Sequence, residues 1–205
     1  MIEIKNLQKA FEDNVIFKDY NLTIEDGAFA VIKGNSGCGK TTLLNMIGAI
    51  EPIDDGQIII DGLDLDVNKN RRKYFGDVVG FLFQNFALID NKTVRQNLEI
   101  IKKKNRSEVT IEDALRRVGL SDKIDEKVYK LSGGEQQRIA LARLMIKSCK
   151  LILADEPTGS LDKENARKVM EILKSLNEEG KTIVMVTHAE EYHDYGTVLV
   201  ELKRE

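Results

Sequence analysis

Cysteine, long apolar runs and net charge are all scarce in this sequence of 205 residues. Its two cysteines, Cys38 and Cys149, are too few for a disulfide framework, which indicates a chain of the reducing cytosol. No apolar run approaches the ~18–20 residues of a membrane-spanning helix, and the first residues lack the features of a secretory signal. The net charge of −3 gives no support for nucleic acid as the main partner, because such domains usually carry a basic face.

The overall composition is ordinary for a globular protein, with 32% charged and 42% hydrophobic residues, and the length fits one domain, residues 1–205. Short apolar or alternating runs predict strands, and longer amphipathic segments predict helices. The predicted strands cover residues 2–9, 15–24, 28–33, 57–60, 78–83, 151–154, 182–186 and 198–202. The predicted helices cover residues 41–50, 93–104, 111–118, 135–147 and 163–177.

No strand is predicted within residues 85–148, where only helices are expected. On both sides of this block, strands and helices alternate, which is typical of an α/β fold. We therefore expect an α/β nucleotide-binding core formed by residues 1–84 and 149–205, with residues 85–148 as an inserted helical subdomain.

A glycine-rich motif of the form G-x-x-x-x-G-K-[ST] follows directly after the strand predicted at residues 28–33. Its glycines let backbone N–H groups approach an anion, and the N-terminus of the next helix adds partial positive charge. Lys40 would neutralise charge on the β- and γ-phosphates, and Thr41 would offer its hydroxyl to Mg²⁺. The motif predicts a nucleotide site formed by Gly34, Asn35, Ser36, Gly37, Cys38, Gly39, Lys40, Thr41 and Thr42.

Two adjacent carboxylates, Asp155 and Glu156, follow the apolar strand predicted at residues 151–154. The carboxyl ends of the strands form the edge of an open α/β sheet where ligands bind. Because neighbouring residues of a strand point in opposite directions, the two acids can have different roles. Asp155 would hold Mg²⁺ through water, and Glu156 would orient or deprotonate an attacking water, a step worth ~10²–10⁴-fold in rate.

A third motif, Leu-Ser-Gly-Gly-Glu-Gln-Gln-Arg, occupies residues 131–138. Ser132 and Glu135 have the spacing of a capping box, so one interpretation is that the segment begins a helix. Gly133 and Gly134 are poor helix residues that cost up to ~1 kcal/mol each relative to alanine. They favour a second interpretation, in which exposed amides contact an anion.

The order of these three motifs resembles that of the ATP-binding-cassette (ABC) ATPases, over about residues 2–203. The resemblance implies a P-loop NTPase (RecA-like) core, an N-terminal antiparallel β subdomain and the inserted helical subdomain. It also implies an ATPase that uses ATP and Mg²⁺. In the family, the segment that matches residues 131–138 contacts the γ-phosphate held by another subunit, so the resemblance implies a head-to-tail homodimer with two ATP at its interface.

The resemblance also implies roles for four further positions. Gln84 would sense Mg²⁺ and the attacking water at a hinge, although a glutamine satisfied by the backbone is the alternative. His188 would contact the γ-phosphate, whereas His193 matches no family position and is expected at the surface. Phe11 would stack on adenine, a contact worth ~1–3 kcal/mol per base, with a core phenylalanine as the alternative. Asp162 ends the family's loop after the catalytic glutamate.

Within the family, residues 79–89 and 155–162 are most similar to the lipoprotein-releasing and macrolide-export type. The run at residues 84–91 is similar to the bacteriocin-export branch of that type. This similarity implies a cytoplasmic subunit, peripheral on the inner face of the cell membrane, that drives a separate integral membrane permease. It implies export of a peptide, lipoprotein or drug, or a mechanical stroke. The alternative is a non-transport ABC ATPase acting on ribosome or DNA, which the single cassette and the lack of heptads disfavour.

Three smaller features have two interpretations each. Cys38 is either a thiol activated by the helix N-terminus and the lysine charge, or a small filler. The basic run at residues 102–106 is either a solvated loop, which we favour, or a phosphate-binding patch. Phe86, Leu88 and Ile89 either form the floor of a groove that docks the permease, as the family implies for residues 84–94, or pack in the core.

Overall fold

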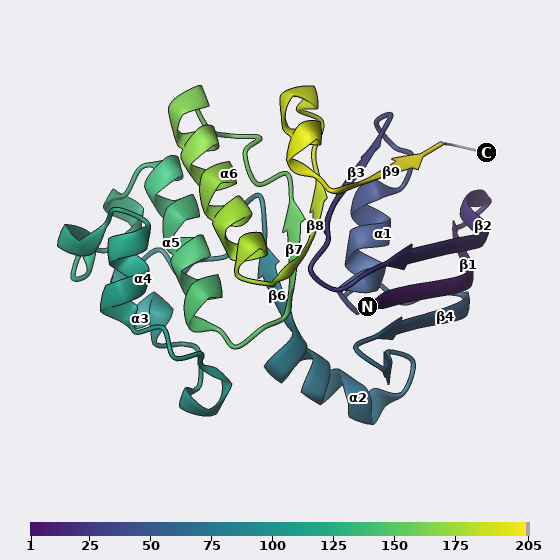
Figure 1. The fold of residues 1–205 in the computed structure, drawn as a ribbon, viewed down its shortest axis with the longest axis horizontal. Coiled ribbons are helices and arrows are strands. Elements are labelled where there is room, and N and C mark those ends of the chain that lie inside the picture. Colours follow the sequence, from purple (N-terminus) through teal and green to yellow (C-terminus); the bar gives the residue numbers. More distant parts are fainter. Residues whose placement is uncertain (204–205) are drawn as a thin grey trace.

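The computed structural model describes residues 1–203 and contains two β-sheets with helices around them (Figure 1). The smaller sheet is antiparallel, with strand order β2-β1-β4-β5, and the larger one is parallel, with order β6-β7-β8-β3-β9. The strands are β1 (Ile2–Phe11), β2 (Asn14–Ile24), β3 (Phe29–Gly34), β4 (Asp55–Ile60), β5 (Leu63–Asp64), β6 (Val79–Leu82), β7 (Leu151–Asp155), β8 (Thr182–Val186) and β9 (Val198–Leu202). The predicted P-loop NTPase core with an N-terminal antiparallel β subdomain is confirmed.

The central parallel sheet is covered on both faces, and alternate residues of one strand enter different hydrophobic cores. In β8, Ile183 and Met185 pack on the side of α4 (Ile111–Arg117), α5 (Gly133–Ile146) and α6 (Lys163–Glu178). Val184 and Val186 pack on the opposite side, with α1 (Lys40–Ile47) and the antiparallel sheet. Figure 1 shows α5 and α6 to one side of the strands and α1 to the other. Burial on both faces explains why these strands are continuous apolar runs.

Between β6 and β7 the chain is helical, as expected, but the predicted helix at residues 93–104 is much shorter. It is α3 (Val94–Leu98), which begins with a complete capping box at Thr93 and Gln96. Beyond Leu98 the carbonyl of Ile101 accepts a hydrogen bond from Arg106 Nε at 2.8 Å, and a 3₁₀ turn follows. A local side-chain-to-backbone hydrogen bond thus satisfies a carbonyl for which the sequence pattern predicts a helical partner.

One helical segment was absent from the sequence prediction. It consists of α2 (Asn68–Lys73) and a π-helical turn (Tyr74–Val78). All six α2 residues are polar, four of them basic and two asparagine, so no amphipathic pattern marks the helix. Tyr74 anchors it, because its fully buried side chain donates a hydrogen bond to the carbonyl of Ile47 at 2.6 Å. Within residues 1–203, every helix is too short or too polar to cross a bilayer.

Candidate nucleotide-binding and catalytic site

The glycine-rich loop joins β3 to α1, as predicted. Gly39 caps α1 with φ of 95°, and a Cβ there would lie 2.5 Å from Ile16 Cγ2, so both conformation and space require glycine. Asn35, Ser36 and Gly37 are exposed, whereas Lys40 is buried. The Lys40 ammonium donates hydrogen bonds to the carbonyls of Gly34 at 2.8 Å and Asn35 at 2.9 Å. The loop carbonyls thus hold the Lys40 ammonium group next to the N-terminus of α1.

Two of the three residues predicted to serve Mg²⁺, Thr41 and Asp155, meet in the structure. The Thr41 hydroxyl, on α1, donates a hydrogen bond to Asp155 Oδ1, at the end of β7, at 3.3 Å. Burial raises the pKa of the Asp155 carboxyl, and the hydrogen bond from Thr41 and the nearby His188 oppose that shift. Hydroxyl and carboxylate oxygens are the hard ligands that Mg²⁺ prefers, so the residues present fit this ion.

Glu156 follows Asp155 in a strained conformation, with φ of 44°. A left-handed conformation in a residue other than glycine costs ~1–3 kcal/mol, and such strain tends to occur at functional sites. The Glu156 amide donates to the carbonyl of Val186 at 3.0 Å, which ties the turn to β8. The side chain is 16% exposed, and its Oε1 is buried without a hydrogen-bond partner.

His188 lies beside this carboxylate. Its backbone N–H donates to Glu156 Oε2 at 3.3 Å, and its Nε2 lies 3.5 Å from Glu156 Oε1. The structure therefore brings together two of the four residues predicted to be catalytic, Glu156 and His188, and the other two are Gln84 and Lys40. His193 lies instead in the 3₁₀ turn Glu190–Tyr195, and it is partly buried rather than fully at the surface.

The third motif begins α5 through the predicted capping box. Ser132 Oγ accepts a hydrogen bond from the Glu135 amide at 3.3 Å, and Glu135 Oε2 accepts one from the Ser132 amide at 2.8 Å. The latter bond holds the pKa of the Glu135 carboxyl below its usual range. The helix starts at Gly133, two residues earlier than predicted.

The two glycines of this motif differ. A Cβ on Gly134 would lie 2.5 Å from Asn165 Cγ, so helix packing inside the chain already requires glycine there. A Cβ on Gly133 would find its nearest neighbour, Phe86 Cζ, at 3.7 Å, an ordinary contact. Gly133 is exposed and Gly134 is buried. Packing against Asn165 therefore explains why residue 134 is a glycine, and the contact of the two amides with an anion stays a prediction.

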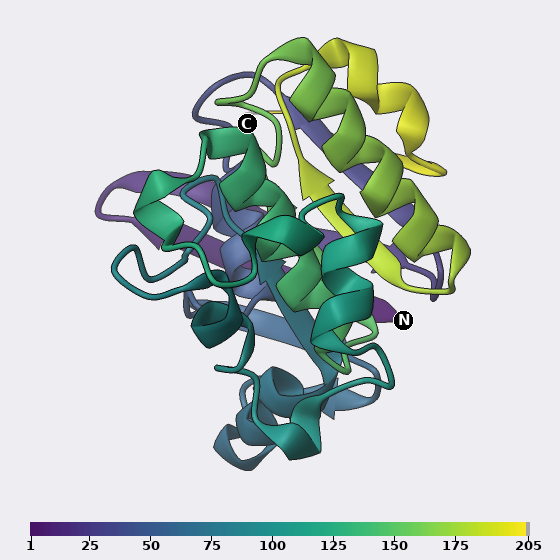
Figure 2. The same ribbon diagram turned by 90° about the vertical axis from the view of Figure 1, so that its left-hand side faces the viewer.

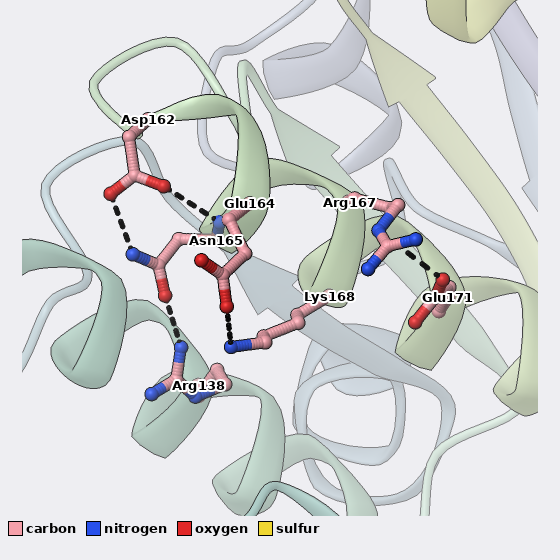
Figure 3. A network of polar contacts seen from close by, with 7 residues as sticks. All are labelled: Arg138, Asp162, Glu164, Asn165, Arg167, Lys168 and Glu171. Carbon is pink, nitrogen blue, oxygen red and sulfur yellow. Dashed lines mark hydrogen bonds and ion pairs between the residues drawn. The ribbon is translucent and has the colours of Figure 1, made fainter.

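Asn165 joins α5 to the loop that precedes α6 (Figure 3). Its side-chain oxygen accepts a hydrogen bond from the Arg138 guanidinium, and its Nδ2 donates to Asp162 Oδ2 at 2.7 Å. Asp162 caps α6 by accepting from the Asn165 amide at 2.9 Å, and these bonds lower the pKa of the Asp162 carboxyl. No sequence pattern marks Asn165 as a residue of the site, because a single short polar residue on a helix carries no motif.

Two more residues of α5 donate hydrogen bonds to loops of the site, and no sequence pattern marks either of them. Buried Gln137 donates to the carbonyl of Pro157, next to Glu156, at 2.7 Å. Arg143 donates to the carbonyls of Phe86 at 3.0 Å and Ala87 at 2.5 Å, residues with φ of 61° and 47°. Burial lowers the pKa of Arg143. Helix α5 therefore connects the motif at residues 131–138 to the loops at both neighbouring strand ends.

Gln84 lies in an exposed turn two residues beyond β6, rather than at the strand end. Its Nε2 would be 3.6 Å from a Cβ on Gly159, so it faces the loop after Glu156. Phe86 and Leu88 pack against the core of the helical side, which favours the core alternative for these two. Ile89 is 41% exposed.

Phe11 and Cys38 were each given a functional and a packing interpretation, and the structure favours exposure for Phe11 and packing for Cys38. Phe11 is 45% exposed, so the core alternative is wrong, and the Lys9 ammonium lies 4.8 Å from the centre of its ring. Cys38 is as buried as Cys149, each 5% exposed, and a Cβ on Gly34 would lie 2.7 Å from the Cys38 sulfur. The Cys38 side chain is thus a packing element, and the expectation that it is more accessible than Cys149 is wrong.

Similarity to known proteins agrees with this geometry. Residues 17–159 match the family model for ABC transporters. The chain is 39% identical to the uncharacterized ABC transporter ATP-binding protein MJ1508 of Methanocaldococcus jannaschii, over 99% of this chain and 96% of that protein. It is 38% identical to the macrolide export ATP-binding/permease protein MacB of Campylobacter jejuni, over 99% of this chain but only 33% of that longer protein.

The solved ATP-binding cassette MJ0796, in a dimeric post-hydrolysis state with ADP and Pi, has a TM-score of 0.85 and 34% identity, covering 100% of this chain and 95% of that one. The similar curated proteins include both import and export systems. The chain therefore belongs to the ABC transporter family, as an ATP-binding, ATP-hydrolysing subunit of a transporter similar to the macrolide-export type.

Proposed function

We propose that this subunit works as a head-to-tail homodimer with two ATP at its interface. Each ATP would lie between the phosphate loop of one copy and residues 131–138 of the other. The observation that carries the proposal is the position of Gly133, which is exposed at the start of α5 with no close neighbour to explain it. Helices α5 and α1 pack on opposite faces of the central sheet, which supports sharing between copies.

Each side chain of the phosphate-loop half would have a separate role. Lys40 would exchange its carbonyl partners for phosphate oxygens, which bear full negative charge. Thr41 and Asp155, with Gln84 from its turn, would hold Mg²⁺, which supplies charge neutralisation at the phosphates. Phe11 would stack on adenine with its exposed ring face.

Glu156 would act as the base that accepts a proton from the attacking water. Its Oε1 is a buried acceptor without a partner, and such an atom is poised to bind a water when the site closes. The His188 amide keeps the other oxygen in place, and the His188 imidazole faces Oε1, where it can also contact the γ-phosphate. Asp162 and the adjoining loop would face the partner copy across the interface.

The variant Glu156→Gln tests this assignment. It should bind ATP, because Lys40 and Asp155 remain, and hydrolyse it ~10²–10⁴-fold more slowly, because an amide cannot take the proton. Size-exclusion chromatography should show a dimer with ATP and a monomer without it. As a control, Glu156→Gln combined with Ser132→Arg should stay monomeric with ATP. Near-wild-type turnover of Glu156→Gln would show that another group is the base.

A second part of the proposal concerns the membrane partner of the subunit. We propose that the subunit lies peripherally on the cytoplasmic face of the cell membrane and drives a separate permease. Similarity to a macrolide export protein supports export of a drug, lipoprotein or peptide such as a bacteriocin, or a mechanical stroke on the permease. Residues 85–148 would move as a subdomain. Co-purification with its own membrane subunit, followed by transport assays in vesicles of defined orientation, tests partner and direction together.

A further inference from the structure

Lys9 is a buried lysine of β1 whose ammonium group is held by three oxygen atoms. The Lys9 Nζ lies 2.7 Å from Glu51 Oε1 and 3.3 Å from Asp54 Oδ1. It also donates a hydrogen bond to the carbonyl of Pro52 at 2.9 Å. The hydrogen bond to Glu51 is the main cause that raises the pKa of Lys9, and burial opposes it. Lys9 is therefore a fixed cation at neutral pH.

The three oxygens connect β1 to the helix that begins at the phosphate loop. They come from residues 51–54, which follow shortly after the C-terminal end of α1. At the other end of α1, Phe17 of β2 packs against the phosphate loop, because a Cβ on Gly39 would lie 3.1 Å from Phe17 Cζ. Phe17 and Lys9 are paired across the hairpin of β1 and β2. Figure 1 and Figure 2 both show this purple hairpin beside α1, and contacts at both ends of the helix hold it there.

The Lys9 ammonium also contacts the aromatic ring that would stack on the nucleotide base. Phe11 is the last residue of β1, two positions after Lys9, and its ring centre lies 4.8 Å from the Lys9 Nζ. This distance is that of a cation–π contact. The ring is 45% exposed, so part of its surface remains free for a base. An exposed side chain normally exchanges rotamers within nanoseconds, and a fixed cation against the ring restricts that exchange.

We propose that Lys9 is a positioning residue that holds the Phe11 ring at a fixed place relative to the phosphate loop. The inference rests on the proposed stacking of Phe11 on adenine, and it names the group that orients the ring for that contact. Because Lys9 is bound to residues 51–54, α1 sets the spacing between the base and the phosphates. A ring that is already ordered loses less conformational freedom when the base binds, which strengthens binding of the base and leaves binding of the phosphates unchanged.

Two probes separate these contributions: ADP, which carries the base and is the product of hydrolysis, and inorganic pyrophosphate, which has no base. Titration calorimetry with Mg²⁺ measures both on the full chain. Phe11→Ala should bind ADP about five- to 100-fold more weakly than wild type, with pyrophosphate affinity unchanged. Lys9→Met should bind ADP roughly two- to fivefold more weakly, again with pyrophosphate affinity unchanged. Lys9→Arg keeps a cation at the ring and should retain most of the ADP affinity. Lys9→Met/Glu51→Gln leaves less unpaired charge than Lys9→Met and should show the same ratio between the probes.

The matched control is Lys5→Met, which removes another lysine of β1, one paired with Glu3. It should bind both probes as wild type does. Lys9→Met/Phe11→Ala should bind ADP as Phe11→Ala does, because Lys9 acts through the ring. Equal weakening of both probes by Lys9→Met, additive losses in the double variant, or an ADP affinity that only Phe11→Ala lowers would each overturn the inference and leave the stacking in place. Wild-type ADP affinity in Phe11→Ala would overturn the stacking itself.

Discussion

The phosphate-loop half of the site and the half at residues 131–138 are built differently. In the first, Lys40 bonds to the end of β3, and Thr41 donates a hydrogen bond to Asp155 at the end of β7. In the second, two polar side chains of α5 turn inward, to the loop carbonyl of Pro157 and to Asn165 on α6. What remains exposed is the backbone at Gly133. One chain thus contains a phosphate-loop half with its catalytic side chains in place, and a second half at residues 131–138 whose exposed backbone is available to a second copy.

The two halves also differ in how well their polar groups are satisfied. Glu156 is strained, with a buried oxygen that has no partner, and Asp155 has a raised pKa. Ser132 and Glu135, in contrast, satisfy each other through the capping box. The phosphate-loop half therefore has polar groups that can gain partners when Mg·ATP binds. The half at residues 131–138 has its capping groups already paired and should change little.

After Glu156→Gln, the largest single-residue effect should come from His188, with His193 as its control. His188→Ala removes the imidazole that faces Glu156, and we expect turnover to fall about 10²-fold, at the low end of general acid–base effects. His193→Ala, in the neighbouring 3₁₀ turn, should stay within about twofold of wild type. Steady-state ATPase assays measure both. Equal losses would mean that this segment matters only for folding.

Alanine substitutions at the two glycines of α5 should affect different properties, thermal stability for Gly134 and the ATP-dependent dimer for Gly133. Gly134→Ala forces a Cβ against Asn165 and should cost about 1–3 kcal/mol, seen as a drop in Tm of roughly 2–10 °C. Gly133→Ala should keep or raise Tm but weaken the ATP-dependent dimer, because its Cβ faces outward. Adding Asn165→Ala to Gly134→Ala should restore part of the lost stability. A normal Tm for Gly134→Ala would contradict the packing explanation.

Asp155 should show a trade-off between stability and Mg²⁺ binding. A carboxyl whose folded pKa is raised stabilises the fold below its unfolded pKa of about 3.8 and loses that contribution as pH rises through the folded value. At pH 7–8 without nucleotide, Asp155→Asn should therefore raise Tm by about 2 °C, and the gain should disappear near pH 4. Mg·ATP should stabilise wild type but not the variant. A lower Tm at pH 7–8 would show that the ionised carboxylate is favourable.

The smallest effects should come from the cysteines. Cys38 and Cys149 are equally buried, so a maleimide should modify both slowly in the folded protein, at rates within a few-fold of each other. Cys38→Ser should remain active, because the side chain packs against Gly34 rather than facing the loop surface. Fast labelling of Cys38 that Mg·ATP prevents would restore the reactive-thiol interpretation.

The sequence predicts best where one local signal decides the structure. The bounds of β8 and β9 match the predicted ranges of residues 182–186 and 198–202, because apolar runs between turns leave no competing structure. The Thr41–Asp155 contact follows from motifs at strand ends that share one sheet edge. The family resemblance, rather than residue patterns, supplied the roles of Gln84, His188 and Phe11.

Side-chain contacts, local and distant, account for what the sequence did not predict. The amphipathic pattern continues past Leu98, but the carbonyls of Glu99 and Ile101 accept hydrogen bonds from the Arg106 side chain in the following loop. The basic helix α2 forms because Tyr74 is buried beside it. Asn165 and Arg143 act through partners more than 25 residues away, and a pattern within one segment does not contain such a partner.

Mixing two inactive variants tests the shared site most directly. Lys40→Ala disables one half, and Ser132→Arg fills the other where the γ-phosphate would lie; melting curves and circular dichroism should confirm that both are folded. In an equal mixture, half of the dimers combine both chains, and each has one intact site, so about a quarter of wild-type activity should return. Pull-down with two different tags verifies that mixed dimers form. Mixed dimers without any recovered ATPase activity would contradict a site shared between two copies.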